Sequence, residues 1–307
     1  MKKVLLATTM LVAGASVAAA QESNITLSGD ARLGIVSDFK DVVTFNSRAR
    51  VTFKLAGETD SGLSFGATFR ADNAGANTTT IAPDGPDADA LPDVANTGGA
   101  VNGMAGNVFI SGAFGKLSMG DVDGAANAAV GQVSGVGYTG LTDLNEVTYI
   151  AGGTKESVLY EYTVSGFTGY VSSGQLSGKD GNPWSLGVKY ATDTYSVSLG
   201  YEDDDNGSTH TIIGATGSFQ GLSLSAIYGK ASGKTVGKQY AVSASYTVDA
   251  ITGTLFYADD SEIKEGAKAT GIGVSYDLGS GAKLSAGYVK NRTADTDSFD
   301  VGVTLKF

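Results

Sequence analysis

Apolar and polar residues alternate one by one along most of this chain. Residues 184–190 (WSLGVKY), 240–248 (YAVSASYTV) and 299–307 (FDVGVTLKF) show the pattern most clearly. A period of two is that of a β-strand, whose successive side chains point to opposite faces, whereas a helix repeats every 3.6 residues. The alternation recurs from Asn24 to the last residue. We therefore predict an all-β protein whose strands have one apolar face and one polar face.

The connections between these strands alternate between two lengths. Tight connections fall at residues 57–62, 112–115, 165–166, 192–193, 220–221, 249–250 and 279–281, and longer polar ones at residues 37–41, 73–103, 121–154, 174–182, 202–207, 232–237, 260–266 and 292–297. Seven turns and eight loops join sixteen strands. Residues 146–150 also alternate, but a seventeenth strand would break the even count, so we assign them to the return of the third long loop. Short turns at one end and long loops at the other are typical of an outer-membrane β-barrel.

The composition agrees with a membrane protein built from strands. Charged residues make up 17% and apolar residues 42% of the chain, which matches neither a disordered chain nor a bundle of membrane helices. A sheet in lipid must close on itself, because no water satisfies an open edge, and its apolar face turns outward. We therefore predict a closed antiparallel transmembrane β-barrel of about sixteen strands, wide enough to enclose an aqueous channel. The alternative is a water-soluble β-sandwich with the aromatic residues in its core.

Aromatic residues of the apolar face gather near the strand ends. If the strands alternate in direction, one group lies near the turn end, namely Phe53, Phe65, Tyr162, Tyr190, Tyr195, Phe219, Tyr246, Tyr276 and Phe307. A second group lies near the loop end, namely Tyr170, Tyr201, Tyr228, Tyr240, Tyr257 and Tyr288. Two such bands are the aromatic girdles of outer-membrane barrels, whereas a sandwich core would favour the strand middles.

The first twenty residues differ from the rest of the chain. Lys2 and Lys3 precede an apolar stretch rich in small residues, and three alanines end it before Gln21. This is the pattern of a cleaved secretory signal, so we predict removal of residues 1–20 and a mature barrel of residues 21–307. The alternative, an uncleaved membrane anchor, needs a longer apolar stretch. Loss of the two lysines takes the formal charge from −11 to −13, and so acidic a chain is unsuited to a nucleic-acid partner.

The chain has few residues suited to catalysis or to metal binding. It has no Cys and a single His, His210, which excludes disulfides, thiolate sites and sites with several His ligands. A hydrolase in the barrel wall would need a nucleophile beside a base, and the sequence shows no such group around His210. Residues 135–140 contain the motif GxGxxG, but no βαβ pattern surrounds it, so in a chain with 44 Gly we interpret it as a chance match.

Basic residues gather on the polar face of the first three strands. They are Arg32, Arg48, Arg50, Arg70 and Lys54, and antiparallel neighbours would set them side by side on the lumen wall. The long connection of residues 121–154 carries Asp121, Asp123, Asp143 and Glu146 around a Gly- and Ala-rich stretch. We predict that this loop folds into the lumen and places its carboxylates across from the arginines, which creates a transverse field at the narrowest point. The alternative is that the arginines form ion pairs with neighbouring strands and the loop acids are solvated.

Several segments in sequence order resemble the Gram-negative general-diffusion porins, particularly the alphaproteobacterial type. They are MKKVLLATT at the start, LSGDARLGI (27–35), SRARVTF (47–53), TDSGLSFGATFRA (59–71), FGKLSMGDVDGA (114–125) and the terminal Phe307. The resemblance extends over essentially the whole chain. It implies a homotrimer of barrels, each with its third long loop folded inward to narrow its own pore.

The expected function is an outer-membrane channel for passive diffusion of small hydrophilic solutes and ions. We expect outer-membrane lipids and lipopolysaccharide as surroundings and no cofactor, although the acidic residues at 84–93 and 203–205 offer oxygen ligands of the kind that Ca²⁺ prefers. The same acidic loops favour a weak preference for cations, which the arginines oppose. A substrate-specific channel, a hydrolase in the barrel wall and a plugged structural barrel are the alternatives.

Overall fold

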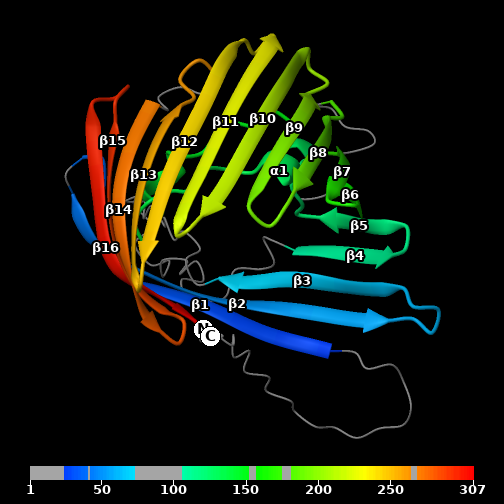
Figure 1. The fold of residues 1–307 in the computed structure, drawn as a ribbon, viewed down its shortest axis with the longest axis horizontal. Helices are drawn as coiled ribbons and strands as arrows, with labels where there is room; N and C mark the ends of the chain where they lie inside the picture. Colours follow the sequence, from blue (N-terminus) through cyan, green and yellow to red (C-terminus); the bar gives the residue numbers. More distant parts are fainter. Residues whose placement is uncertain (1–23, 41, 73–105, 152–156, 175–180, 264–267) are drawn as a thin grey trace, which may run out of the picture.

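Sixteen antiparallel strands form one closed barrel (Figure 1). The computed structural model describes residues 24–40, 42–72, 106–151, 157–174, 181–263 and 268–307. The strands are β1 (Asn24–Ser37), β2 (Val43–Glu58), β3 (Ser64–Asp72), β4 (Gly106–Gly112), β5 (Gly115–Gly120), β6 (Ser157–Val164), β7 (Phe167–Ser173), β8 (Trp184–Ala191), β9 (Tyr195–Asp203), β10 (Ser208–Phe219), β11 (Leu222–Gly233), β12 (Gly237–Val248), β13 (Ile251–Asp259), β14 (Lys268–Gly279), β15 (Ala282–Asn291) and β16 (Thr296–Lys306). The predicted fold class and the even strand count are confirmed. The expected signal, residues 1–20, lies outside the described residues.

The barrel closes where the last strand pairs with the first. Residues of β16 pair with β1 from Lys306 opposite Asp30 to Asp300 opposite Val36. The register continues one step further, because the backbone N–H of Phe307 donates to the oxygen of Gly29 at 2.9 Å and the N–H of Gly29 donates back at 3.2 Å. Closure leaves no open edge, which is the condition for a sheet in lipid.

The short turns use backbone conformations that match the twist of a hairpin. Ser165 and Gly166 have φ of 50° and 83°, and Gln220 and Gly221 have φ of 47° and 83°. Two successive residues with positive φ make the two-residue turn that suits the right-handed twist of paired strands. Gly at the second position adopts this conformation without strain.

The outer face carries the predicted aromatic residues, with one exception. Tyr195, Tyr246, Tyr276 and Phe307 near the turn end, and Tyr228 and Tyr288 near the loop end, are all more than 40% exposed on the surface of the isolated barrel. Four further tyrosines lie on the same face, because each is directly opposite an outward residue of the next strand. The pairs are Tyr162 with Gly169, Tyr190 with Val197, Tyr201 with Leu186 and Tyr257 with Val242. Neighbouring rings contact each other across strands, for example Tyr240 and Tyr257 with centroids 5.8 Å apart.

Tyr170 is the exception, and its assignment to the loop-end girdle is wrong. It lies opposite Glu161 in the pairing of β6 with β7, and directly opposite residues share a face. Glu161 forms an ion pair with Lys116 on the lumen side. Alternation in β7 therefore turns Val171, not Tyr170, to the outside, where it is 52% exposed.

The connection between β5 and β6 lies inside the barrel, as predicted for the third long loop. We call residues 121–156 the inserted loop; its described part contains the helix α1 (Ala125–Val130) and the 3₁₀-helix η1 (Leu141–Asp143). Figure 1 shows α1 within the ring of strands, and its contacts are with β7, β8, β9 and β10, while η1 contacts β15 and β16. Residues 146–150 belong to this loop and form no strand, as expected.

Neither described helix is long or apolar enough to span a membrane.

Candidate functional site: the channel lumen

The predicted basic residues lie on one patch of the lumen wall, which we call the arginine ladder (Arg32, Arg48, Arg50, Arg70 and Lys54). The pairing of β1 with β2 sets Arg32 opposite Arg48, and the pairing of β2 with β3 sets Arg70 opposite Thr52, between Arg50 and Lys54 of the same face. The guanidinium groups are half-buried, with the side chains of Arg48 and Arg50 18% and 22% exposed. A column of like charges is costly unless counter-charges lie nearby.

Two carboxylates of the same strands lie within ion-pair distance of the ladder. Asp30 of β1 accepts from Arg48 at 3.3 Å, and Asp72 of β3 lies 2.8 Å from Arg50 and 3.8 Å from Arg70. Neither aspartate was predicted as part of the site, although Asp30 lies two residues before Arg32 and Asp72 two residues after Arg70, which places them on the same face of their strands. Within the described part of the chain, the five cations of the ladder thus form ion pairs with two carboxylates, which leaves a positive excess among these residues.

Asp121 and Asp123, at the start of the inserted loop, lie beside the wall of β4 to β6. They line a polar hollow of about 370 Å³ together with Lys116 and Glu161, which pair with each other at 3.3 Å. Both aspartates are exposed to the lumen. Among the residues with known positions, the ion pairs of Arg48, Arg50 and Arg70 are thus with the wall and not with these loop acids.

Asp143 and Glu146 lie further along the inserted loop, and both are exposed. Burial raises the pKa of Tyr149 in the same loop, and the negative charges of Glu202, Asp123 and Glu146 raise it further. The charges of Glu202, Asp123 and Glu146 thus all reach the buried ring of Tyr149.

Glycines of the wall let the inserted loop lie directly on the strands. A Cβ at Gly200 of β9 would lie 2.6 Å from Cβ of Ala126 in α1, and a Cβ at Gly287 of β15 would lie 2.5 Å from Cα of Gly137. Such approaches are closer than real Cβ contacts allow. Of the GxGxxG motif, Gly137 thus packs on the wall, whereas Gly135 and Gly140 face Asn145 and Asp143 of the loop itself.

Hydroxyl groups of the wall satisfy backbone N–H groups of the inserted loop. The N–H of Ala125 donates to Oγ of Ser172 at 2.8 Å, and the N–H of Ser134 donates to Oγ of Ser243 at 3.0 Å. A buried N–H without a partner is costly, so these bonds favour one position of the loop.

A third anchor brings the inserted loop to the arginine ladder. The N–H and hydroxyl of Thr139 donate to the carboxylate of Asp300 at 2.7 and 2.6 Å. Arg32 in turn donates to the carbonyl oxygen of Thr139 at 3.3 Å. The neighbouring Tyr138 is 6% exposed, and this burial, together with the charge of Asp300, raises its pKa.

The buried apolar residues lie mainly in the seam between the inserted loop and the wall. The inner faces of β10, β11, β13 and β15 contribute Ile212, Ile227, Phe256 and Val289, all at most 5% exposed. Each is next to an outward apolar residue, as in Ile212 beside Ile213 or Phe256 beside Leu255. Such pairs break the alternation, and they are the sequence pattern that marks wall covered on both faces.

His210 lies in this seam and is completely buried. Its Nδ1 is 2.8 Å from Glu202, and its Nε2 is 3.0 Å from the amide nitrogen of Gln239. Both partners also bond to the inserted loop, Glu202 to Ile150 and Gln239 to Thr148, and so connect the loop to the wall. Glu202, Gln239 and Asp300 are functional candidates that the sequence analysis did not identify.

Two acidic segments, residues 84–93 and 203–205, were considered as Ca²⁺ sites, and the structure describes only the second. Residues 84–93 lie outside the described part of the chain. In residues 203–205, Asp203 accepts the N–H of Asp205 at 2.9 Å and Asp204 accepts that of Ser208 at 2.8 Å. Over the described ranges, no group of three or more Asp, Glu, His or Cys side chains is arranged to hold a metal ion.

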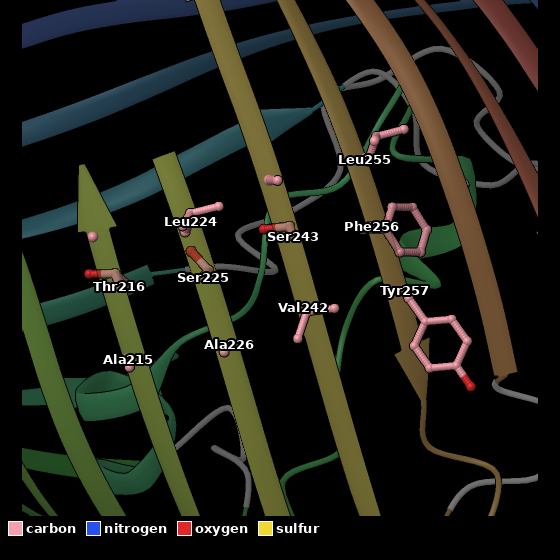
Figure 2. A pocket seen from close by; sticks show the side chains of 12 residues that line it. Ala215, Thr216, Leu224, Ser225, Ala226, Val242, Ser243, Leu255, Phe256 and Tyr257 are labelled. Carbon is pink, nitrogen blue, oxygen red and sulfur yellow. The ribbon is translucent and has the colours of Figure 1, made fainter. Parts of the chain in front are cut away.

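A separate apolar hollow of about 610 Å³ lies over β10 to β13 (Figure 2). Ala215 and Ala226 leave space between the larger Leu224, Val242 and Leu255. These residues belong to the outward set of their strands, so the hollow faces the surroundings of the barrel and is not part of the channel.

Both the sequence and the fold are similar to those of known porins. The sequence matches the family described as Gram-negative porin over residues 7–296. The porin of Rhodobacter capsulatus is 31% identical over 324 residues, which cover 92% of this chain and 100% of the relative. A porin structure refined at 1.8 Å resolution is 30% identical, with the same coverage and a TM-score of 0.70. A triple mutant of the Rhodopseudomonas blastica porin is 22% identical over 92% of this chain and 100% of its own, with a TM-score of 0.70.

Proposed function

The chain belongs to the Gram-negative porin family, and from this premise we propose which residues narrow its channel and how they select solutes. The protein is an outer-membrane β-barrel that forms a water-filled channel for passive diffusion. We propose that the constriction lies between the arginine ladder on one side and the inserted loop on the other.

The observation that carries this proposal is the one-sided position of the inserted loop. The loop packs against β7 to β10 through α1 and against β15 and β16 through η1. Apart from Arg32, which bonds to Thr139 of the loop, the ladder on β1 to β3 therefore keeps lumen in front of it. Solutes that pass the loop meet guanidinium groups on one side and carboxylates on the other, an arrangement that favours small polar solutes over apolar ones.

Replacement of Arg48 and Arg70 by Ser tests the assignment. The double variant leaves Asp30 and Asp72 with fewer counter-charges, so we expect a higher single-channel conductance in planar bilayers and a reversal potential shifted toward cations. Arg292→Ser is the matched control, because Arg292 lies beyond β15 and donates to Thr270 at 2.7 Å, away from the ladder. Equal conductance and reversal potential in the double variant and the wild type would reject the ladder as the constriction.

We propose a weak preference for cations. The mature chain has an excess of acidic residues, and the exposed acids Asp121, Asp123, Asp143 and Glu146 line the approach on the loop side. The arginine ladder limits the preference but does not reverse it. A reversal potential in a KCl gradient that favours chloride would contradict this assignment.

We also propose that residues 1–20 are removed on export, that three barrels associate, and that the aromatic bands of the outer face contact lipids and lipopolysaccharide. Support comes from the pattern before Gln21 and from outward rings near both strand ends. Sequencing of the mature N-terminus checks the first point, and an N-terminus at Met1 would contradict it.

A further inference from the structure

Glu202, His210 and Gln239 connect three strands of the wall to one segment of the inserted loop. The carboxylate of Glu202 accepts the N–H groups of Ile150 and Ala151 at 3.0 and 3.3 Å. The side-chain amide of Gln239 forms two bonds with Thr148: its oxygen accepts the N–H at 2.8 Å, and its nitrogen donates to the carbonyl at 2.7 Å. His210 lies between the two wall residues and bonds to both.

These bonds determine which nitrogen of His210 carries the proton. The two bonds to Thr148 orient the amide of Gln239 so that its nitrogen, a donor, faces Nε2 of His210 at 3.0 Å. Nε2 must then be the acceptor, and Nδ1–H donates to Glu202. The network is complete only when the imidazole is neutral.

Protonation of His210 breaks this arrangement at one point. A proton on Nε2 would face the NH₂ group of Gln239, donor against donor. If the amide rotates to present its oxygen to His210, its oxygen faces the carbonyl of Thr148 and its nitrogen faces the N–H. Both bonds to the inserted loop are then lost, while the pair of His210 with Glu202 is kept and strengthened by charge.

We propose that His210 is a positioning residue that makes the attachment of the inserted loop depend on pH. Neutral His210 holds Gln239 in the orientation that binds Thr148. Protonated His210 removes both Gln239 bonds and so loosens the segment around Thr148, which the bonds to Asp260 and Glu202 still attach to the wall. This inference rests on the proposed role of the inserted loop as the wall of the constriction.

The groups that face His210 come from the wall and from the inserted loop. The carboxylate of Glu202 on β9 faces Nδ1, and the side-chain amide of Gln239 on β12 faces Nε2. The ring of Tyr149 from the loop approaches edge-on with centroids 6.4 Å apart, and Gly229 of β11 has no side chain. The other acid at this point is Asp260, which accepts the hydroxyl of Thr148 at 2.6 Å.

We expect the loosened segment to move toward the lumen. Thr148 lies between the wall and the lumen, and the wall is closed by paired strands. Movement away from Gln239 therefore brings the segment into the channel. Protonation is thus expected to produce partial closures and not a larger pore.

Single-channel recordings across the range in which histidine titrates test the proposal. His210 is the only His in the chain, and carboxylates titrate well below this range, so His210 is the expected titrating side chain. Between about pH 7.5 and about pH 5.5, we expect closures of the purified wild-type protein in planar bilayers to become about tenfold more frequent, since two hydrogen bonds are lost. His210→Gln cannot take a proton, and we expect the frequency of its closures to stay constant over the same range.

Ser243→Ala is the matched control. It removes another bond between wall and loop, from the N–H of Ser134, without a titrating group. We expect it to raise the frequency of closures by the same factor at every pH and to keep the wild-type pH step. A constant frequency in the wild type, or an unchanged pH step in His210→Gln, would overturn the proposal. If the wild-type protein conducts steadily but its closures do not change with pH, the pH switch fails while the proposed channel function stands. If the protein carries no steady current, the proposed channel function itself fails.

Discussion

Single glycines determine how close the inserted loop lies to the wall, and with it the width of the lumen. Gly287 of β15 and Gly200 of β9 both lie under the loop, where a Cβ would meet Gly137 and Ala126. Other strand glycines have open space: a Cβ at Gly253 of β13 meets nothing within 4 Å. The same residue type is thus a requirement at one position and a neutral choice at another.

Replacement of Gly287 by Ala should narrow the channel. The added methyl would lie 2.5 Å from backbone atoms of Gly137, so the loop must move toward the lumen or the strand must shift. We expect a lower single-channel conductance and a loss of about 1–3 kcal/mol in the free energy of unfolding, as for other overpacked sites. Gly253→Ala is the control, expected to change neither. Equal conductance in Gly287→Ala and the wild type would show that the loop does not rest on this glycine.

The strands and short turns follow from local pattern, whereas the partners of the inserted loop do not. Alternation and turn residues specify each hairpin from its own sequence, so all sixteen strands and the even count were predictable. The bonds from Glu202 to Ile150 and from Asp300 to Thr139 join residues far apart in sequence, and no local pattern specifies them. The error at Tyr170 has a different origin: alternation along β7 turns this ring to the lumen, and proximity to a strand end does not determine which face a ring occupies.

The loop between β1 and β2 offers a pH prediction at the scale of one element. The carboxylate of Asp38 accepts the N–H groups of Val42 and Lys40 at 2.9 and 2.8 Å, and these bonds lower its pKa from the ordinary value of 3.8. The ionised carboxylate therefore stabilises the loop. This contribution is fully present above pH 3.8 and is lost as the pH falls through the lowered pKa. We expect the amide resonances of Lys40 and Val42 to shift together, below pH 3.8, in NMR spectra of the protein in detergent micelles.

Asp38→Asn provides the comparison for this titration. Its amide oxygen accepts the same two bonds but takes no proton in this range. The two resonances should then stay constant with pH. A wild-type transition above the ordinary aspartate value would contradict the assignment.

At the scale of the whole molecule, the barrel has little core except where the inserted loop meets the wall. The outer face is apolar, the ladder side of the lumen is ionic, and closure depends on the pairing of β16 with β1. The last residue takes part through its backbone, while its ring is 77% exposed on the outer face.

Deletion of Phe307 should therefore destabilise the barrel more than Phe307→Ala. The deletion removes both backbone bonds with Gly29, and we expect a loss of about 1–3 kcal/mol in the free energy of unfolding. The alanine variant keeps these bonds and loses only contacts of an exposed ring. Urea unfolding of both variants in detergent micelles measures the difference, and equal stabilities would show that the ring and not the backbone secures closure.

The most direct test of a wet lumen narrowed from one side is the current through the purified protein in a planar bilayer. For a porin with an open constriction, we predict a steady current that rises linearly with voltage, and conductance steps that come in threes if the barrels associate as trimers. A barrel that inserts into the bilayer but carries no steady current would contradict the account.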